Sequence, residues 1–201
     1  MSDVSAFWDE RFARPGFAYG DAPNDFLVEA LPRLPRGRAL SLGEGEGRNA
    51  IFLARNGFEV TAVDASAVGL AKARARAEAA GVSLTTVHAD LAAWRPARDH
   101  FDVVVAVFCH LPPALRRDVH RAALAALRPG GAVVIEAYTP AQLAHGTGGP
   151  KDPSLLYTLD ALREDLAGAS FEVAIERTRE IHEGALHDGM SAVVQVLARR
   201  V

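Results

Sequence analysis

Short apolar runs alternate with longer polar segments through most of this chain. Each run is rich in branched or aromatic residues and is followed by turn or helix signals, a pattern typical of strands buried in a parallel sheet. The strands predicted in this way are Ala39–Leu42, Val60–Val63, Leu84–His88, Val103–Phe108 and Ala132–Tyr138. Two later runs, Phe171–Thr178 and Ala192–Ala198, predict an antiparallel pair at the sheet edge, with His182 to Gly189 as a loop between them.

Helices are expected between these strands. Ser66 is placed as an N-cap, and Gly57 and Gly81 are placed as C-caps. The predicted helices are Asn49 to Asn56, Ser66 to Ala80, Pro113 to Leu127 and Leu159–Leu166, with one more from about Asn24 to Leu31. This alternation predicts an α/β fold, Rossmann-like and doubly wound, with a mostly parallel seven-stranded sheet and an antiparallel C-terminal edge strand.

The length of 201 residues favours a single domain. Residues 1–35, which include Phe7, Trp8, Phe12, Phe17 and Tyr19, are expected to form an N-terminal helical cover. Residues 36–201 are expected to form the Rossmann-like core. The sequence contains no repeat, linker or low-complexity tract that would suggest a second domain.

Composition and charge narrow the classes of partner. The net charge is −3 and the arginines are scattered singly, so no basic stripe is available to neutralise a nucleic acid backbone. The lone Cys109 and the widely spaced histidines lack the spacing of a zinc site. Neither a signal peptide nor a membrane span is evident. We therefore expect a cytoplasmic protein, monomer or homodimer, that acts on a small molecule without a metal.

A glycine-rich loop, Gly43-Glu44-Gly45-Glu46-Gly47, follows the first predicted strand and precedes a helix. Glycines at this junction allow the backbone to turn tightly and approach a ligand. About 20 residues further on, Asp64 ends the second strand, where such folds place a carboxylate that binds a ribose. Asp90 follows the third strand at the same sheet edge and is a candidate for the adenine amine. Together these positions predict an adenosine-type cofactor.

The spacing and charge of the loop favour S-adenosylmethionine over a nicotinamide dinucleotide. The dinucleotide fingerprint is GxGxxG, and its pyrophosphate needs an electropositive pocket. This loop reads GxGxG, and Glu44 and Glu46 would repel a pyrophosphate. S-adenosylmethionine carries no phosphate and presents a sulfonium and an ammonium, so a methyl donor fits better.

Several segments resemble class I S-adenosylmethionine-dependent methyltransferases, and within them the bacterial group related to tellurite-resistance and thiopurine methyltransferases. The matching segments are Phe7-Trp8-Asp9-Glu10-Arg11-Phe12, Tyr19-Gly20, Pro23-Asn24-Asp25-Phe26-Leu27, Glu44-Gly45-Glu46-Gly47-Arg48-Asn49-Ala50, Val63-Asp64-Ala65-Ser66, Leu127-Arg128-Pro129-Gly130-Gly131 and Thr147-Gly148-Gly149-Pro150-Lys151-Asp152. The cofactor-binding residues expected from the loop and this resemblance are Gly43, Glu44, Gly45, Gly47, Asn49, Asp64, Ala65, Asp90, Leu91, Phe108 and Tyr19.

One position departs from the family pattern. The broad class usually has an acidic residue two places before the first glycine, where this chain has Ser41. Glu44 or a water molecule is expected to take over the contact with the cofactor's ammonium group.

Methyl transfer to a small molecule, such as a thiol or a chalcogen oxyanion, is the expected activity. His110, just beyond the fourth strand, is a natural wall beside the methyl group, and His187 in the late loop is a candidate for acceptor binding or proton removal. A plain surface histidine is the alternative for His187, and a solvated cation is the alternative for Arg179 as an anchor for an anionic acceptor. Cys109 is expected to be a small buried thiol.

Two other functions remain open from the sequence. A non-catalytic S-adenosylmethionine-binding module would keep the glycine loop and Asp64 but lack an acceptor cavity. An NAD(P)-dependent oxidoreductase of the short-chain type would need a Tyr-x-x-x-Lys pair, and none of the three tyrosines has a lysine four residues further on.

Overall fold

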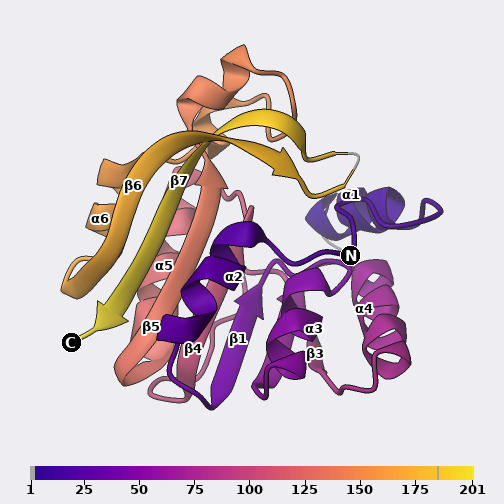
Figure 1. Cartoon of the computed structure of the whole chain (residues 1–201), viewed down its shortest axis with the longest axis horizontal. Helices are drawn as coiled ribbons and strands as arrows, with labels where there is room; N and C mark the ends of the chain where they lie inside the picture. Colours follow the sequence, from indigo (N-terminus) through magenta and orange to yellow (C-terminus); the bar gives the residue numbers. More distant parts are fainter. Residues whose placement is uncertain (1–2, 185) are drawn as a thin grey trace.

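The computed structural model describes residues 3–184 and 186–201, whose strands form one seven-stranded sheet in the order β3-β2-β1-β4-β5-β7-β6 (Figure 1). The strands are β1 Arg38–Leu42, β2 Glu59–Asp64, β3 Thr85–His88, β4 Phe101–Val107, β5 Leu127–Tyr138, β6 Ala169–His182 and β7 Asp188–Arg200. The α-helices are α1 Asp3–Phe12, α2 Asp25–Ala30, α3 Arg48–Arg55, α4 Ala67–Ala79, α5 Pro113–Ala126 and α6 Leu159–Asp165. Short 3-10 helices cover Leu31–Arg33, Pro140–Ala144 and Pro153–Leu155.

The predicted fold class is confirmed. Strands β3, β2, β1, β4 and β5 pair in parallel, whereas β7 pairs antiparallel with both β5 and β6. The C-terminal strand β7 therefore lies between β5 and β6, and β6 forms the edge of the sheet.

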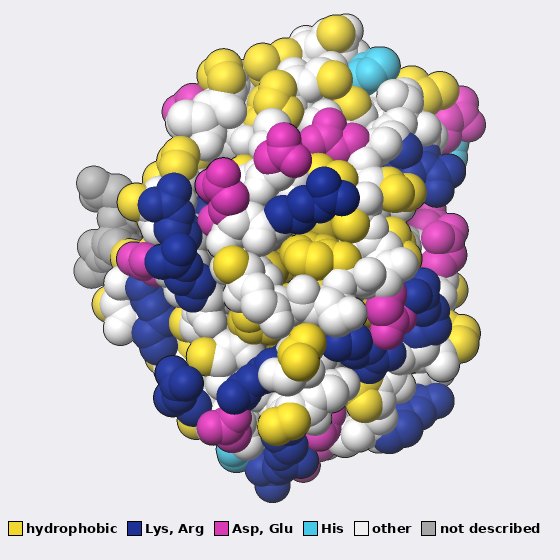
Figure 2. Space-filling model, turned by 90° about the vertical axis from the view of Figure 1, so that its left-hand side faces the viewer, with side chains coloured by type: hydrophobic (Ala, Val, Ile, Leu, Met, Phe, Trp, Pro, Cys, Tyr) yellow, Lys and Arg dark blue, Asp and Glu magenta, His cyan; other side chains and the backbone are white. Residues whose placement is uncertain are grey.

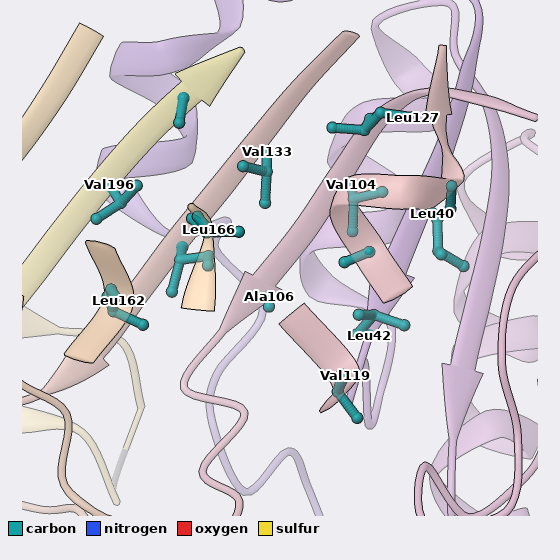
Figure 3. Packing of buried hydrophobic residues seen from close by; sticks show 14 of the residues in the cluster. Leu40, Leu42, Val104, Ala106, Val119, Leu127, Val133, Leu162, Leu166 and Val196 are labelled. Atoms are coloured by element: carbon teal, nitrogen blue, oxygen red, sulfur yellow. The ribbon is translucent and has the colours of Figure 1, made fainter. Parts of the chain in front are cut away.

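Helices cover both faces of the sheet. Side chains of α2, α3 and α4, such as Leu53 and Leu70, pack in one apolar cluster. Side chains of α5 and α6 pack in another. Figure 3 shows part of the second cluster, in which Leu162 of α6 and Leu166, which follows that helix, lie near Val133 and Val196 of the sheet. Successive residues of a strand belong to different clusters, since Ala39 packs in the first cluster and Leu40 in the second. Both sheet faces are therefore apolar, as parallel strands require.

The capping residues act as predicted. The Ser66 hydroxyl accepts a hydrogen bond from the amide of Gly69 at 2.9 Å, and Gly57 and Gly81 follow their helices with φ of +84° and +69°. Asn24 caps α2, because its side-chain oxygen accepts from the amide of Leu27 at 3.0 Å.

The largest differences from the sequence-based elements lie at the two ends of the chain. Strands β6 and β7 extend well beyond the predicted Phe171–Thr178 and Ala192–Ala198, and they pair as far as His182 and Asp188. Much of β6 is exposed, so this edge strand lacks the apolar run that identifies buried strands. The N-terminal helical cover begins with α1, whose bounds the sequence did not predict.

The carboxyl ends of β1, β2, β4 and β5 meet at one edge of the sheet, where helix α1 and the tip of the β6–β7 hairpin lie next to each other (Figure 1). Figure 2 views the molecule from the side of β6 and α6, where charged side chains of both signs surround apolar ones. None of the described helices is long and apolar enough to cross a membrane.

Candidate functional site

The glycine loop after β1 has a backbone that only glycine tolerates. Gly43, Gly45 and Gly47 have φ of +62°, +62° and +91°. A Cβ on Gly43 would stand 2.8 Å from Sγ of Cys109, and one on Gly45 would stand 2.8 Å from the Phe12 ring. The loop is thus pressed between the N-terminal cover and the end of β4.

The side chain of Glu44 forms hydrogen bonds that stabilise this loop. Its Oε1 accepts hydrogen bonds from the amides of Asn49 and Ala50 at 3.0 and 2.9 Å, which caps the first turn of α3. Its Oε2 accepts a hydrogen bond from the hydroxyl of Ser41. The carboxyl is buried, and burial raises the pKa of Glu44 above its usual value. A carboxylate therefore does lie at the end of β1, supplied by the loop instead of the strand.

Asp64 at the end of β2 is tied directly to the loop. Its Oδ2 accepts from the amide of Gly45 at 2.8 Å and its Oδ1 from the amide of Ser66 at 2.7 Å. Burial raises the pKa of this carboxyl, while the two amide hydrogen bonds oppose that rise. The structure thus brings the two halves of the predicted adenosine site together. Asp90 accepts from the amide of Ala92 at 2.8 Å, a local turn contact.

The N-terminal cover is anchored to the same edge. Asp9 of α1 accepts hydrogen bonds from the Ser66 hydroxyl at 2.6 Å and from the amide of Val68 at 3.1 Å, so it caps α4 from another element. Glu46 accepts from the amide of Ala18 at 2.7 Å and pairs with Lys72 at 2.8 Å. Glu46 therefore attaches the cover to the loop, a role that its position between two glycines did not indicate.

An aromatic cluster formed by Tyr19, Phe108, Tyr138 and His187 lies beside the loop. The Phe108 ring stacks on that of Tyr138 at 4.6 Å between centroids, and His187 contacts Phe108 at 4.4 Å and Tyr19 at 4.5 Å. Phe108 has φ of +52°, an unusual conformation for a bulky residue. Such strain is concentrated at functional sites. Four segments that are far apart in the sequence thus contribute one ring each to this aromatic cluster.

His110 is held by the backbone on both ring nitrogens. Its Nδ1 lies 2.7 Å from the carbonyl oxygen of Leu155, and its Nε2 accepts from the amide of Tyr138 at 3.4 Å. Burial lowers the pKa of His110 to about 4. Both contacts suit a neutral ring that donates from Nδ1, so neither nitrogen is left for proton transfer.

His187 differs from His110 in one respect. It is also buried, but its Nδ1 has no hydrogen-bond partner among the described residues. Burial is the largest cause that lowers the pKa of His187 well below its usual value, and the nearby cation of Arg48 adds to the effect. The aromatic cluster therefore contains a neutral imidazole whose Nδ1 has no partner among the described residues.

Arg179 is not a free cation. Its guanidinium donates to both carboxylate oxygens of Glu136 at 3.0 Å and to Glu183 at 3.0 Å. Glu183 also lies 2.6 Å from Arg48 of α3, and its Oε1 accepts from the Asn24 side chain at 2.9 Å. This buried network joins the β6–β7 hairpin, the N-terminal cover and helix α3. Local sequence patterns do not reveal this network, because its members are separated by up to 159 positions.

Tyr138 was also missed as a site residue. It ends β5 at the same edge of the sheet where Phe108 follows the last residue of β4, so the reasoning that selected Phe108 applies to it equally. The lone Cys109 is packed against the loop, and burial raises the pKa of its thiol to about 12. The thiol therefore stays protonated.

Comparison with known proteins places this geometry in context. Residues 39–131 match the family model described as "Methyltransferase domain". A protein-L-isoaspartate O-methyltransferase from Methylorubrum extorquens is 32% identical over 144 residues, which are 64% of this chain and 60% of that protein. The chain thus covers less than two thirds of this curated relative.

Solved structures share the fold over almost the whole chain. One, from work on the conversion of a disulfide bond into a thioacetal group during echinomycin biosynthesis, has a TM-score of 0.76 at 22% identity, over 98% of this chain and 89% of that one. TehB from Haemophilus influenzae has a TM-score of 0.73 at 19% identity, over 98% of this chain and 67% of that one. These matches confirm the Rossmann-like fold, and the sequence matches support the predicted enzyme class and its cofactor.

Proposed function

We propose that this chain, which carries the methyltransferase-domain match in its core, is an S-adenosylmethionine-dependent methyltransferase with a small-molecule acceptor. The observation that carries the proposal is the hydrogen bond from the Gly45 amide to the Asp64 carboxylate. It fixes a glycine cradle and a ribose-binding carboxylate side by side at the sheet edge. Residues 1–35 act as the cover of this single domain.

The residues present fit the cofactor. Gly43, Gly45 and Gly47 give the loop a backbone with positive φ, and with Asn49 they would surround the methionine part. Each oxygen of Asp64 accepts one backbone amide and keeps a second lone pair, which is enough to bind the two ribose hydroxyls beside Ala65.

The remaining predicted contacts line the rest of the site. Asp90 and Leu91 would contact the adenine, and Phe108 and Tyr19 would enclose the reacting methyl group. Lys72, which would otherwise attract a phosphate, is already paired with Glu46. The charges near the loop therefore favour a cofactor without a pyrophosphate.

The cofactor, when bound, supplies a methyl group activated by a sulfonium. The protein's part is to hold the acceptor in line and to exclude water, and orientation of this kind can contribute roughly 7–11 kcal/mol. The aromatic cluster, in which Tyr138 and His187 are buried and Tyr19 and Phe108 half-buried, is suited to both tasks, because its rings are rigid.

The finer proposal is that the acceptor is a thiol or a chalcogen oxyanion. It is supported by the resemblance to the tellurite-resistance and thiopurine group, and by the similarity in fold to a structure concerned with chemistry at sulfur. Soft nucleophiles of this kind need little help from a general base.

A screen of acceptors tests the proposal. The full chain is incubated with S-adenosylmethionine and, separately, with thiols, selenite, tellurite and small phenols, and release of S-adenosylhomocysteine is measured. Turnover with at least one of them is expected. Tight binding of S-adenosylmethionine without turnover on any of them would favour a non-catalytic binding module instead.

A further inference from the structure

Three consecutive residues beyond β4 are hydrogen-bonded to one short segment that precedes α6. The Tyr157 hydroxyl donates to the carbonyl of Cys109 at 2.7 Å and accepts from the amide of Leu111 at 2.7 Å. Between these two residues, Nδ1 of His110 lies 2.7 Å from the carbonyl oxygen of Leu155. One segment therefore holds three successive residues at the end of the strand.

These contacts follow directly on Phe108, whose backbone is strained. Of the described residues other than glycine, only Phe108 and Asp99 have a positive φ, +52° in each case. Asp99 lies in an exposed turn, and aspartate adopts this conformation more readily than a bulky aromatic residue. A strained conformation persists only where the surrounding contacts over-determine it. The Phe108 amide donates to the carbonyl of Glu136 at 2.7 Å, and the three residues that follow supply further restraints.

The Tyr157 ring is itself fixed by α5 and α6. The guanidinium of Arg116 lies 5.2 Å from the ring centroid, and the His120 ring meets it edge-on at 5.8 Å. Both side chains bind the buried Asp165 carboxylate, at 2.7 and 2.9 Å. Burial is the largest cause that raises the pKa of Tyr157 well above its usual value, so the hydroxyl keeps its proton and can donate to a carbonyl. The hydroxyl is thus held in one place in its protonated form.

Tyr157 also binds the end of the neighbouring strand β5. Its amide donates to the carbonyl of Tyr138 at 2.9 Å. The Tyr138 ring stacks on that of Phe108 at 4.6 Å between centroids. Tyr157 therefore makes backbone contacts at the ends of both strands whose aromatic rings stack in the cluster, through its hydroxyl at β4 and through its amide at β5.

We propose that Tyr157 is a positioning residue for methyl transfer: its hydroxyl keeps Phe108 in the strained conformation that directs this ring into the aromatic cluster. The inference rests on the proposed function, in which Phe108 helps to enclose the reacting methyl group. The glycine loop and Asp64 are joined by a hydrogen bond of their own, at 2.8 Å from the Gly45 amide. Loss of the Tyr157 hydroxyl should therefore change the orientation of the reacting groups far more than the affinity for the cofactor.

The variant Tyr157→Phe tests the link between this hydroxyl and Phe108, because it keeps the ring and removes only the hydroxyl. Backbone chemical shifts of Phe108 report its φ and are measured by NMR on the isotope-labelled full chain, saturated with S-adenosylhomocysteine. In Tyr157→Phe these shifts should move towards the values typical of a negative φ. Wild-type shifts at Phe108 in this variant would overturn the proposal.

Thr158→Ala is the matched control for a loss of stability at the same place in the chain. The Thr158 hydroxyl accepts from the amide of Ala161 at 3.2 Å and so caps α6. Its removal should lower the melting temperature, as removal of the Tyr157 hydroxyl should, but it should leave the shifts of Phe108 at their wild-type values. Equal changes at Phe108 in both variants would overturn the proposal, because reduced stability alone would then release Phe108.

The activity of the same variants separates positioning from folding. The acceptor is whichever of benzyl mercaptan, phenol, selenite and tellurite the wild-type protein methylates fastest. Tyr157→Phe should lower kcat at least about tenfold through misplacement of the reacting groups, while the Kd for S-adenosylhomocysteine stays near its wild-type value. Thr158→Ala should keep the wild-type kcat. An unchanged kcat in Tyr157→Phe would contradict the positioning role, whereas no turnover by the wild-type protein would contradict the proposed function and leave the NMR result to decide the link to Phe108.

Discussion

The Ser41 hydroxyl donates a hydrogen bond to the Glu44 carboxylate, three residues further along the chain. The same carboxylate caps α3 through the amides of Asn49 and Ala50. A buried carboxyl thus lies at the end of β1, although the loop supplies it and not the strand. Ser41 and Glu44 form one hydrogen-bonded unit at this end of the candidate site.

The first prediction concerns this unit. Glu44→Ala leaves two amides of α3 uncapped and the Ser41 hydroxyl without its acceptor, so the free energy of unfolding should fall by about 2–3 kcal/mol. Glu44→Gln keeps an acceptor oxygen and should lose less than half as much. Urea denaturation measures both, with the exposed Glu29→Ala as the control. Equal stability of Glu44→Ala and the control would refute the capping role.

The second prediction concerns cofactor affinity. Asp64→Asn replaces a charged acceptor with a neutral amide, which should raise the Kd for S-adenosylhomocysteine at least about tenfold. Asp102→Asn is the matched control. Asp102 also accepts a hydrogen bond from a backbone amide, that of Arg38 at 2.7 Å, but it lies near the start of β4, at the end of the sheet away from the glycine loop. Its Kd should stay at the wild-type value. An equal effect of the two substitutions on Kd would show that Asp64 acts through folding alone.

The third prediction is a pH dependence of stability. His110 has a pKa of about 4 in the folded protein, below the value of about 6.5 in an unfolded chain. Protonation therefore favours unfolding, so stability falls as the pH drops from about 6.5 towards 4. The contribution between pH 7 and pH 4.5 is about 2–3 kcal/mol.

Replacing His110 with Gln isolates that contribution. The variant should lose about 2–3 kcal/mol less stability than the wild-type protein between pH 7 and pH 4.5 in urea titrations. The other titrating groups are present in both proteins and cancel in the comparison. The same loss in both proteins would mean that His110 does not resist protonation in the folded state.

The fourth prediction concerns the contact between the cover and the hairpin. A Cβ on Gly184 would stand 2.3 Å from the backbone nitrogen of Gly20, so Gly184→Ala must separate the two segments. Gly168 has a similar φ, +92° against +101°, but nothing lies near its Cβ position. Gly168→Ala therefore serves as the control for backbone strain, which costs about 1–2 kcal/mol.

Limited proteolysis reports on this separation. Gly184→Ala should expose the segment before α2 to cleavage, whereas Gly168→Ala should be cut at the wild-type rate. Wild-type resistance of Gly184→Ala would show that the hairpin tip and the cover are not held together at this point.

Local patterns were sufficient to predict the sheet and the meeting of the glycine loop with Asp64 at one end of it. The branched runs, the cap at Ser66 and the glycine loop are short-range signals, and each reports on its immediate surroundings. The position of Asp64 follows from topology alone, because parallel strands bring their carboxyl ends to one edge.

The aromatic cluster could be predicted only in part. Tyr19, Phe108 and His187 were expected at the site, whereas Tyr138 was not. Their contacts depend on tertiary packing and on a hairpin whose exposed strand carries no apolar signal. The buried network of Glu136, Arg179 and Glu183 depends on the same packing. Charged residues in a sequence do not reveal whether they will be paired inside the fold.

Calorimetric titration of the full chain with S-adenosylhomocysteine, S-adenosylmethionine and NAD, in parallel, tests the central claim most directly. The two methyl-transfer ligands should bind at a single site, and NAD should give no heat of binding. Binding of NAD with no response to either of the other two would contradict the assignment of the glycine loop and Asp64 to a methyl donor.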